Sequence, residues 1–288
     1  MRTEEVPPTV DSITGVESKD VVIDSETRVY VRVYKPQNVG KVGVPVYIHG
    51  DGFCMMTPSS PLYQNYLNNL SFKANVIVVS VNYRTAPEYP LPIGYDDSWA
   101  AFKWVFESNH AEPWLRDHVD LSRVYMAGDS AGANIVHNLA RRVEKQGDMT
   151  PICPLKGIIL VQPYFWGKDR IGPEEKKVQP IGFNSLLMDK VWMVASPNSS
   201  GLDDPRLNPG MDHELGNLGT YKVLVSVAEL DAHRDIGFYY KDLLLKSGWK
   251  GDIQVIETLG EDPVFHLFNP DSPKAADLMN QFAEFLNS

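Results

Sequence analysis

A serine flanked by small residues carries the strongest chemical signal in this sequence. The segment GDSAG at 128–132 matches the pattern G-x-S-x-G, with Ser130 at its centre. An apolar run at 124–127 precedes the match, and a helical pattern at 133–146 follows it. In this strand-to-helix context the motif predicts that Ser130 is a catalytic nucleophile and that the backbone N–H of Ala131 faces an oxyanion.

A second segment, HGDGF at 49–53, also follows an apolar run. Its position matches the HGGG-type loop of lipases and esterases, which lends backbone N–H groups to the oxyanion hole. We therefore expect Asp51, Gly52 and Ala131 to form this hole. Asp51 replaces the middle glycine, and its carboxylate would repel a developing oxyanion unless it turns away or is protonated. A role for Asp51 in capping a turn is an equal alternative.

Six segments together suggest one family: HGDGF at 49–53, NYRTAPEYPLP at 82–92, YDD at 95–97, GDSAGANIVHN at 128–138, DPRLNP at 204–209 and SGWKG at 247–251. They resemble the plant carboxylesterase family, a hormone-sensitive-lipase-like branch of the α/β-hydrolases. The resemblance extends from about Val21 to the C-terminus. It implies an α/β-hydrolase fold with a catalytic triad in the chain order serine, acid, histidine.

The resemblance assigns the acid of the triad to Asp231, but the histidine position departs from the family pattern. In the family that histidine lies in a segment similar to Gly-Glu-Asp-His-Val-Phe, whereas this chain has Pro263 at the position. A serine hydroxyl is a weak nucleophile without an adjacent base, and proline cannot act as one. Of the nearby histidines, His266 is preferred over His233 as a substitute, although a structural role is the more expected one for both.

Aromatic residues near the motifs predict a pocket for a large apolar ligand. The expected substrate-binding residues are His49, Phe53, Tyr164, Phe165, Trp166 and Phe265. About half of the aromatic residues in this region are equally well explained as core, and packing is the favoured role of His49.

Three functions follow from these observations. The preferred one is a non-hydrolytic enzyme of the cyclase or lyase type, because positioning a reactive molecule requires no triad base. Such an enzyme would be similar to the triad-altered cyclases of monoterpene indole alkaloid pathways. The acidic Asp51 fits a large, cationic substrate such as an alkaloid intermediate. The second is a carboxylesterase that hydrolyses small esters through Ser130. The third is a binding protein similar to the gibberellin receptor, which belongs to the same family.

The elements that must position these residues alternate between strand-like and helix-like segments. This alternation predicts a single α/β domain over 1–288, with a mostly parallel central sheet flanked by helices. Val29–Tyr34 is expected as an early edge strand, and 133–146 as the helix after the elbow. The segment 163–219 is irregular and rich in Gly, Pro and Asn, which predicts a cap over the site.

The bulk composition limits the possible partners. The 288 residues carry a formal net charge of −10, and Lys and Arg form no dense cluster, which argues against binding to nucleic acid. Apolar runs are far shorter than the roughly 20 residues that span a bilayer, and residues 1–11 do not read as a secretion signal. Cys54 and Cys153 suggest neither a disulfide framework nor a metal site, and no cofactor motif is present. We expect a cytoplasmic monomer or homodimer that needs no cofactor and acts on a small molecule.

Overall fold

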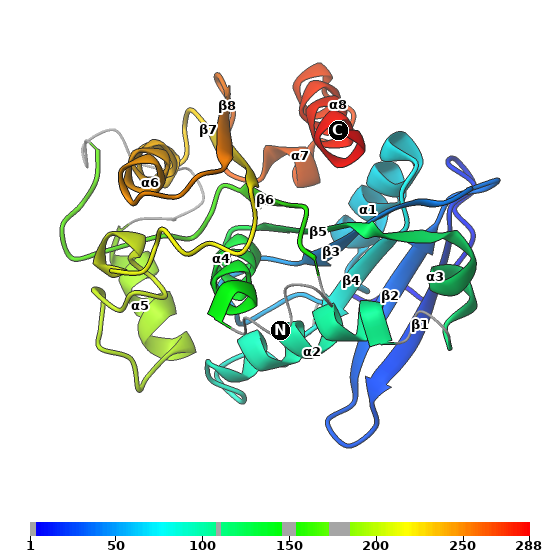
Figure 1. The fold of residues 1–288 in the computed structure, drawn as a ribbon, viewed down its shortest axis with the longest axis horizontal. Helices are drawn as coiled ribbons and strands as arrows, with labels where there is room; N and C mark the ends of the chain where they lie inside the picture. The colour runs from blue at the N-terminus through cyan, green and yellow to red at the C-terminus, as the bar shows by residue number, and fades with distance from the viewer. Residues whose placement is uncertain (1–3, 108–110, 146–153, 173–184) are drawn as a thin grey trace.

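One eight-stranded sheet crosses the part of the chain that the structure describes (Figure 1). The computed structural model describes residues 4–107, 111–145, 154–172 and 185–288. The strand order is β1-β2-β4-β3-β5-β6-β7-β8, with β2 antiparallel to both its neighbours and the strands from β3 to β8 parallel to one another. The strands are β1 (Glu17–Asp24), β2 (Val29–Lys35), β3 (Val42–Ile48), β4 (Val78–Asn82), β5 (Val119–Asp129), β6 (Gly157–Val161), β7 (Lys222–Ala228) and β8 (Asp252–Thr258).

The central strands are rich in β-branched residues. β3 (VGVPVYI) and β6 (GIILV) are buried along their whole length, as expected for strands covered on both faces. The predicted α/β-hydrolase fold with a mostly parallel sheet is confirmed. Val29–Tyr34, however, is not the edge strand that the sequence predicts, because β1 pairs along its outer side. The side chains of β1 are only partly buried, so its apolar pattern is too weak to identify the strand from sequence.

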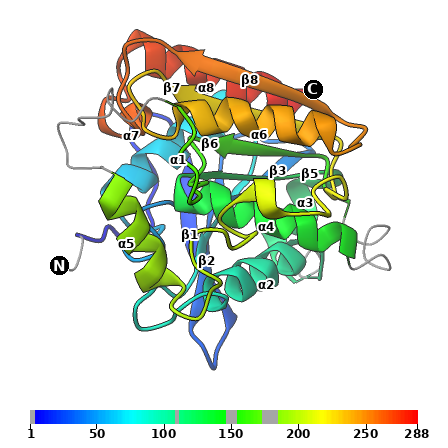
Figure 2. The same ribbon diagram turned by 90° about the vertical axis from the view of Figure 1, so that its left-hand side faces the viewer.

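Helices cover both faces of the sheet (Figures 1 and 2). Residues of α2, α4 and α6 contribute to one hydrophobic cluster, and those of α1, α7 and α8 contribute to another. The helices of the described segments are α1 (Pro61–Ala74), α2 (Ile93–Glu107), α3 (Pro113–His118), α4 (Ala131–Lys145), α5 (Ser185–Ala195), α6 (Arg234–Lys246), α7 (Phe265–Phe268), α8 (Pro273–Asn287) and the 3-10 helix η3 (Pro209–Met211).

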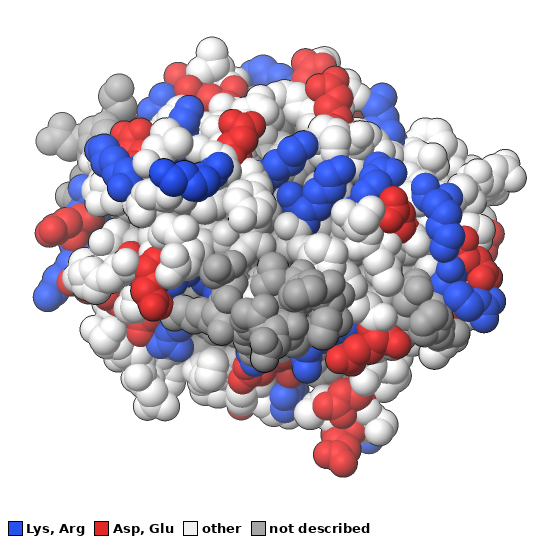
Figure 3. Space-filling model, viewed as in Figure 1, with Lys and Arg blue, Asp and Glu red and all other residues white. Residues whose placement is uncertain are grey.

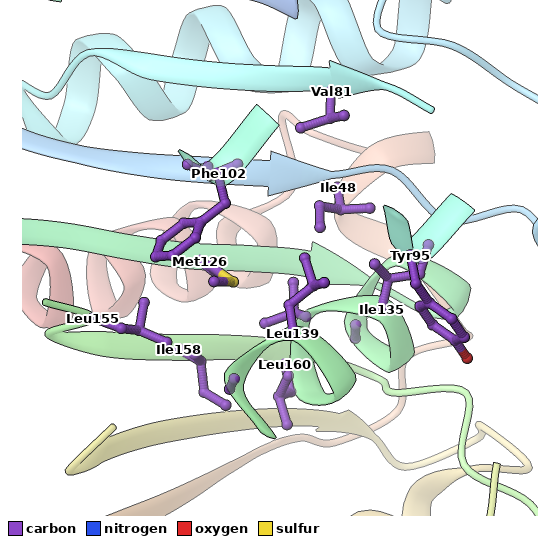
Figure 4. Packing of buried hydrophobic residues seen from close by; sticks show 14 of the residues in the cluster. Ile48, Val81, Tyr95, Phe102, Met126, Ile135, Leu139, Leu155, Ile158 and Leu160 are labelled. Atoms are coloured by element: carbon purple, nitrogen blue, oxygen red, sulfur yellow. The ribbon is translucent and has the colours of Figure 1, made fainter. Parts of the chain in front are cut away.

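The larger cluster supports the strand-to-helix turn that carries Ser130. Figure 4 shows Phe102 of α2 and Leu139 of α4 close to side chains of the central strands, among them Met126 and Ile158. Burial of apolar surface at about 25 cal/mol per Å² is the main stabilising contribution in such a core. The helix after the elbow is thereby held rigidly against the sheet.

The surface carries charged side chains of both signs, which are spread over the face viewed in Figure 3. Among the described helices, none combines the length and the apolar character needed to cross a membrane. The cytoplasmic location and the monomeric or homodimeric state stay predictions.

The segment predicted to form a cap contains α5 and η3. Figure 2 shows α5 to one side of the sheet, apart from the helices that cover its faces. Residues 173–184 of this segment lie outside the described residues. Its role as a cap stays a prediction.

Candidate active site

Ser130 stands on a sharp turn between β5 and α4. Its φ is 50°, in the left-handed region that residues other than glycine rarely adopt, and its N–H donates to the carbonyl oxygen of Val161 at 2.9 Å. Two glycines permit the turn. A Cβ on Gly132 would lie 2.0 Å from the carbonyl oxygen of Ile48, and one on Gly128 would lie 2.6 Å from the same atom. This is the strained turn that the G-x-S-x-G motif predicts, and it leaves the serine partly exposed.

A buried hydrogen-bonded chain ties this turn to the loop after β3. The hydroxyl of Tyr63, on α1, donates to Asp129 Oδ2 at 2.9 Å and accepts from the backbone N–H of Gly50 at 2.8 Å. The hydroxyl of Tyr47 donates to the other oxygen of Asp129 at 2.8 Å. Burial raises the pKa of Asp129 to about 6, and the two tyrosine hydroxyls oppose that rise. Asp129 therefore fixes the position of the loop relative to Ser130.

The loop after β3 has an unusual backbone. Asp51, Gly52 and Phe53 follow one another in the left-handed region, with φ values of 71°, 65° and 64°. Within the described ranges, the backbone N–H groups of Gly52 and Ala131 donate to no other protein group. Asp51, Gly52 and Ser130 all line one cavity. The role of Asp51, Gly52 and Ala131 in binding a developing oxyanion stays a prediction.

The cavity beside Ser130 has a volume of about 290 Å³ and lies at the carboxyl ends of the parallel strands. Apolar and sulfur-containing side chains make up most of its wall, and α5 supplies three of them, Leu187, Met188 and Val191. The lining residues are Asp51, Gly52, Cys54, Met55, Met56, Leu62, Tyr63, Asp129, Ser130, Gln162, Tyr164, Leu187, Met188, Val191, Asp231, His233, Pro263, Val264, Leu267 and Phe268. A cavity of this composition suits a small, mostly apolar molecule.

The loop after β7 places an acid and an imidazole together in this cavity. The Asp231 carboxylate accepts from the backbone N–H of His233 at 2.9 Å and from its Nδ1 at 3.2 Å. The His233 ring lies against Tyr164 and Trp166, with centroid distances of 5.5 and 5.3 Å. Its Nε2 is buried and has no partner among the described residues. Asp231 thus orients one ring nitrogen and leaves the other available.

The loop after β8 carries Pro263 into the same cavity. The next residue, Val264, has a φ of 49°, which is rare for a β-branched side chain. Its backbone N–H donates to the Oε1 of Gln162, a buried residue that follows β6. Gln162 therefore holds the loop in place, while its Nε2 has no partner within the described segments.

The structure does not bring His266 to Ser130. His266 is buried at the start of α7, where it contacts the Tyr66 ring edge-on at 5.1 Å. It lines a separate cavity of about 200 Å³ beside α1 and α8 and is not among the residues that line the cavity with Ser130. Burial lowers its pKa to about 3. The preference for His266 over His233 as the substitute base is therefore corrected, because His266 packs against Tyr66 of α1 and lines the other cavity.

Of the six residues predicted to bind substrate, Tyr164 alone lines the cavity. His49 is fully buried and stacks on Tyr83 with a centroid distance of 4.3 Å, and burial lowers its pKa to about 4. Phe53 packs edge-on against Tyr164 at 5.7 Å. These contacts give His49 the packing role that the sequence favours for it, and they correct the prediction that Phe53 binds substrate.

The other three predicted pocket residues also belong to the core. Phe165 lies against Tyr240 with a centroid distance of 4.9 Å, and the indole N–H of Trp166 donates to Asp189 at 2.8 Å. Phe265 joins the hydrophobic cluster under α8. Their large aromatic surfaces are buried against other apolar side chains. The cavity wall is instead mainly aliphatic and methionine, with Tyr63, Tyr164 and Phe268 as its aromatic members.

Sequence reasoning missed five residues of the site: Tyr63, Gln162, Met55, Met56 and Met188. Tyr63 lies on α1, whose buried face includes Gln64, Asn68 and Ser71 and so lacks a clear apolar stripe. Gln162 follows a strand at the carboxyl edge of a parallel sheet, and this position is a signal that could have identified it. In the described part of the chain, no group of three His, Cys, Asp or Glu side chains is placed to bind a metal ion.

Comparisons with known proteins agree with this geometry. The family described as alpha/beta hydrolase fold matches residues 45–267. A protein of Arabidopsis thaliana named probable carboxylesterase 2 is 43% identical over 290 residues, which cover 99% of this chain and 90% of that protein. A 2-hydroxyisoflavanone dehydratase of Glycyrrhiza echinata is 38% identical over 296 residues, covering 98% of this chain and 88% of the relative.

Among solved structures, the fold is similar to that of EstE1, a thermophilic carboxylesterase cloned from a metagenomic library. The TM-score is 0.81 at 26% sequence identity, and the match covers 98% of this chain and 90% of the other.

Proposed function

Because the chain belongs to the α/β-hydrolase fold family, and within it to the plant carboxylesterases, we propose that it hydrolyses small carboxylic esters through Ser130. The observation that carries the proposal is that Ser130, Asp231 and His233 line one cavity, with His233 hydrogen-bonded to Asp231. This differs from the cyclase that the sequence favours. The names of the relatives support an esterase better, and His233 offers the base that Pro263 cannot be.

In the proposed reaction, Ser130 Oγ attacks the ester carbonyl carbon while His233 Nε2 takes the hydroxyl proton. The backbone N–H groups of Gly52 and Ala131 bind the oxyanion. His233 then returns the proton to the alcohol as the carbon–oxygen bond breaks, leaving an acyl group on Ser130. A water molecule, deprotonated in the same way, releases the carboxylic acid and regenerates the serine. Asp231 accepts a hydrogen bond from the Nδ1–H of His233 throughout and so stabilises the imidazolium that forms.

The base must move toward Ser130 to act. Nε2 of His233 has no partner within hydrogen-bonding distance in the described structure, so Ser130 Oγ is not yet bonded to it. Rotation of the two side chains is expected when substrate fills the cavity, because catalytic hydrogen bonds commonly tighten only in the complex with substrate.

Hydrolysis of p-nitrophenyl butyrate tests the proposal. The unmodified protein should turn the ester over, and Ser130→Ala should fall to the rate in buffer. His233→Leu should lower kcat by about 10² to 10⁴, the usual contribution of a general base. Adding Pro263→His to His233→Leu restores a histidine at the family position and should recover turnover that depends on Ser130.

Two controls make the result specific. His266→Leu removes a buried histidine from the other cavity by the same substitution and should leave kcat within about threefold. Circular dichroism spectra should show that each variant is folded. The proposal is wrong if the unmodified protein is inactive while Pro263→His alone gains turnover, because the fold would then lack only a base.

A second candidate function follows from Pro263 itself. A site with a serine and an oxyanion loop but no histidine at the family position can orient a reactive molecule for cyclisation or elimination without hydrolysis. One relative is named a dehydratase, so the plant relatives are not all named esterases. An inactive protein in the ester assay, which Pro263→His alone converts into an esterase, would favour this candidate.

A further inference from the structure

The Asp51 carboxylate is an unpaired charge in the cavity beside Ser130. Asp51 is held at a φ of 71°, is partly buried and lines the cavity, and its charge acts on Asp129 and Cys54, which line the same cavity. Among the described residues, no side chain or backbone group donates a hydrogen bond to its carboxylate, and no Lys or Arg forms an ion pair with it. Burial raises the pKa of this carboxyl, as expected for a charge without a partner.

The surrounding cavity wall carries negative charge and, within the described ranges, no lysine or arginine. The two other carboxylates that line it are already engaged, Asp129 by two tyrosine hydroxyls and Asp231 by His233. Asp51 is therefore the acidic group that remains to interact with a bound molecule. A cation entering this cavity would meet attraction from three carboxylates in a partly dry environment.

Two buried polar groups in the same cavity also lack partners. Gln162 is 2% exposed and His233 is 8% exposed, and the Nε2 atom of each makes no hydrogen bond within the described structure. An unpaired buried polar atom costs about 1–3 kcal/mol, so such atoms commonly belong to ligand sites. The cavity is thus built to meet polar atoms of a bound molecule as well as its apolar surface.

The Asp51 carboxylate would disfavour the hydrolysis of an ester that carries no charge. Asp51 lies on the loop that presents the Gly52 N–H, so its carboxylate would oppose the negative charge that develops on the carbonyl oxygen. A positive charge on the substrate would pair with Asp51 and cancel that opposition. The same carboxylate would then help one class of substrate and hinder another.

We propose that Asp51 selects esters that carry an ammonium group near the scissile bond, by pairing with that group during hydrolysis. The inference rests on the proposed ester hydrolysis and names its substrate class. It depends on charge and not on hydrogen bonding, so a quaternary ammonium group should satisfy it.

Isosteric ester pairs test the inference, because they differ in charge and hardly in shape. On the alcohol side, choline butyrate is compared with 3,3-dimethylbutyl butyrate. On the acyl side, phenyl 4-(trimethylammonio)butanoate is compared with phenyl 5,5-dimethylhexanoate. In at least one pair, the unmodified protein should have a kcat/KM about tenfold higher for the cation, the ratio that corresponds to about 1.4 kcal/mol.

Asp51→Asn should change the two members of that pair in opposite directions. The kcat/KM for the cationic ester should fall about tenfold, and that for the neutral ester should rise, because the carboxylate no longer opposes the oxyanion. A folding defect would lower both values and cannot produce this crossover. Asp96→Asn is the matched control, since it removes one negative charge from the exposed surface of α2 and should leave both values unchanged. Equal effects on both esters of both pairs would overturn the inference.

Binding to Ser130→Ala separates this inference from the proposed function. This variant holds the esters without turnover, so calorimetry gives their dissociation constants whether or not the protein is an esterase. Tighter binding of the cation, lost on adding Asp51→Asn, would support the charge pairing even if the unmodified protein hydrolysed nothing. Hydrolysis without any preference in binding or in rate would retain the esterase and refute the role of Asp51.

Discussion

Ionisation of Asp129 should cost the folded protein stability, because this buried carboxyl has two tyrosine hydroxyls rather than a cation as side-chain partners. Burial raises its pKa from 3.8 to about 6. Between these pKa values the folded protein binds more protons than the unfolded chain does. The stability that Asp129 contributes is therefore fully present below about pH 3.8 and is lost as pH rises through about 6.

The magnitude follows from the two pKa values. At 1.36 kcal/mol for each tenfold change, ionisation costs the folded protein about 3 kcal/mol more than it costs the unfolded chain. About 2 kcal/mol of this falls between pH 4.5 and pH 7.5, where urea unfolding can be measured. The free energy of unfolding should be measured at both pH values for the unmodified protein and for Asp129→Asn. The free energy of the unmodified protein minus that of the variant should be about 2 kcal/mol larger at pH 4.5.

The comparison isolates one group. Asn cannot ionise, and its amide also changes the hydrogen bonds to Tyr47 and Tyr63, but that change is the same at both pH values. Other titrating groups contribute equally to both proteins and cancel. A difference that stays constant with pH, or that grows as pH rises, would refute the reasoning, because Asp129 would then be no more costly to ionise in the folded protein than in the unfolded chain.

Two further substitutions test the parts that hold the elbow. Tyr63→Phe leaves the Gly50 N–H and one oxygen of Asp129 without their partner, so the free energy of unfolding in urea should fall by about 2 kcal/mol, whereas Tyr66→Phe, which removes a hydroxyl with no hydrogen bond in the described structure, should change it little. Equal losses in the two variants would contradict the assigned role of Tyr63. Gly132→Ala places a Cβ 2.0 Å from the carbonyl oxygen of Ile48 and should cost roughly 3 kcal/mol and abolish ester turnover, with Gly40→Ala as the control because a Cβ there meets nothing within 4 Å. Full activity of Gly132→Ala would show that the turn relaxes without loss.

Local patterns identified the elbow, the strand before it and the helix after it. The strand, the glycines and the helix around Ser130 lie within one continuous stretch, so their combination is visible in the sequence. The first strand and α1 were missed for the opposite reason. β1 is only partly buried, and the buried face of α1 includes Gln64, Asn68 and Ser71, so neither has a clear apolar period.

His233 and His266 lie in different cavities, although the sequence places them in similar settings. His233 and His266 both lie close in sequence to residues that the family resemblance marks as catalytic. The loop before His266 takes a left-handed conformation at Val264, which sequence does not indicate because β-branched residues disfavour it, and His266 lies in the other cavity. His233 is instead fixed by a hydrogen bond to Asp231 only two residues away.

The prediction of an aromatic pocket is wrong because aromatic residues that are neighbours in sequence do not all face the cavity. Phe165 and Trp166 follow Tyr164, which does line the cavity, but they point into the core and toward Asp189. Burying rings of this size contributes more stability when they are fully enclosed, which explains their placement.

The methionine content of the cavity wall has a consequence for how substrate preference can change. Met55, Met56 and Met188 are unbranched, with several rotatable bonds and a polarisable sulfur, so they can rearrange around ligands of different outline at small cost. Such a wall limits the size of the ligand but does not fix its shape. The preference for molecular shape can then drift through single replacements at these three positions while Ser130 and its supporting turn stay unchanged. The same thioethers would make the cavity sensitive to peroxide, because oxidation converts the apolar methionine side chain into a polar sulfoxide.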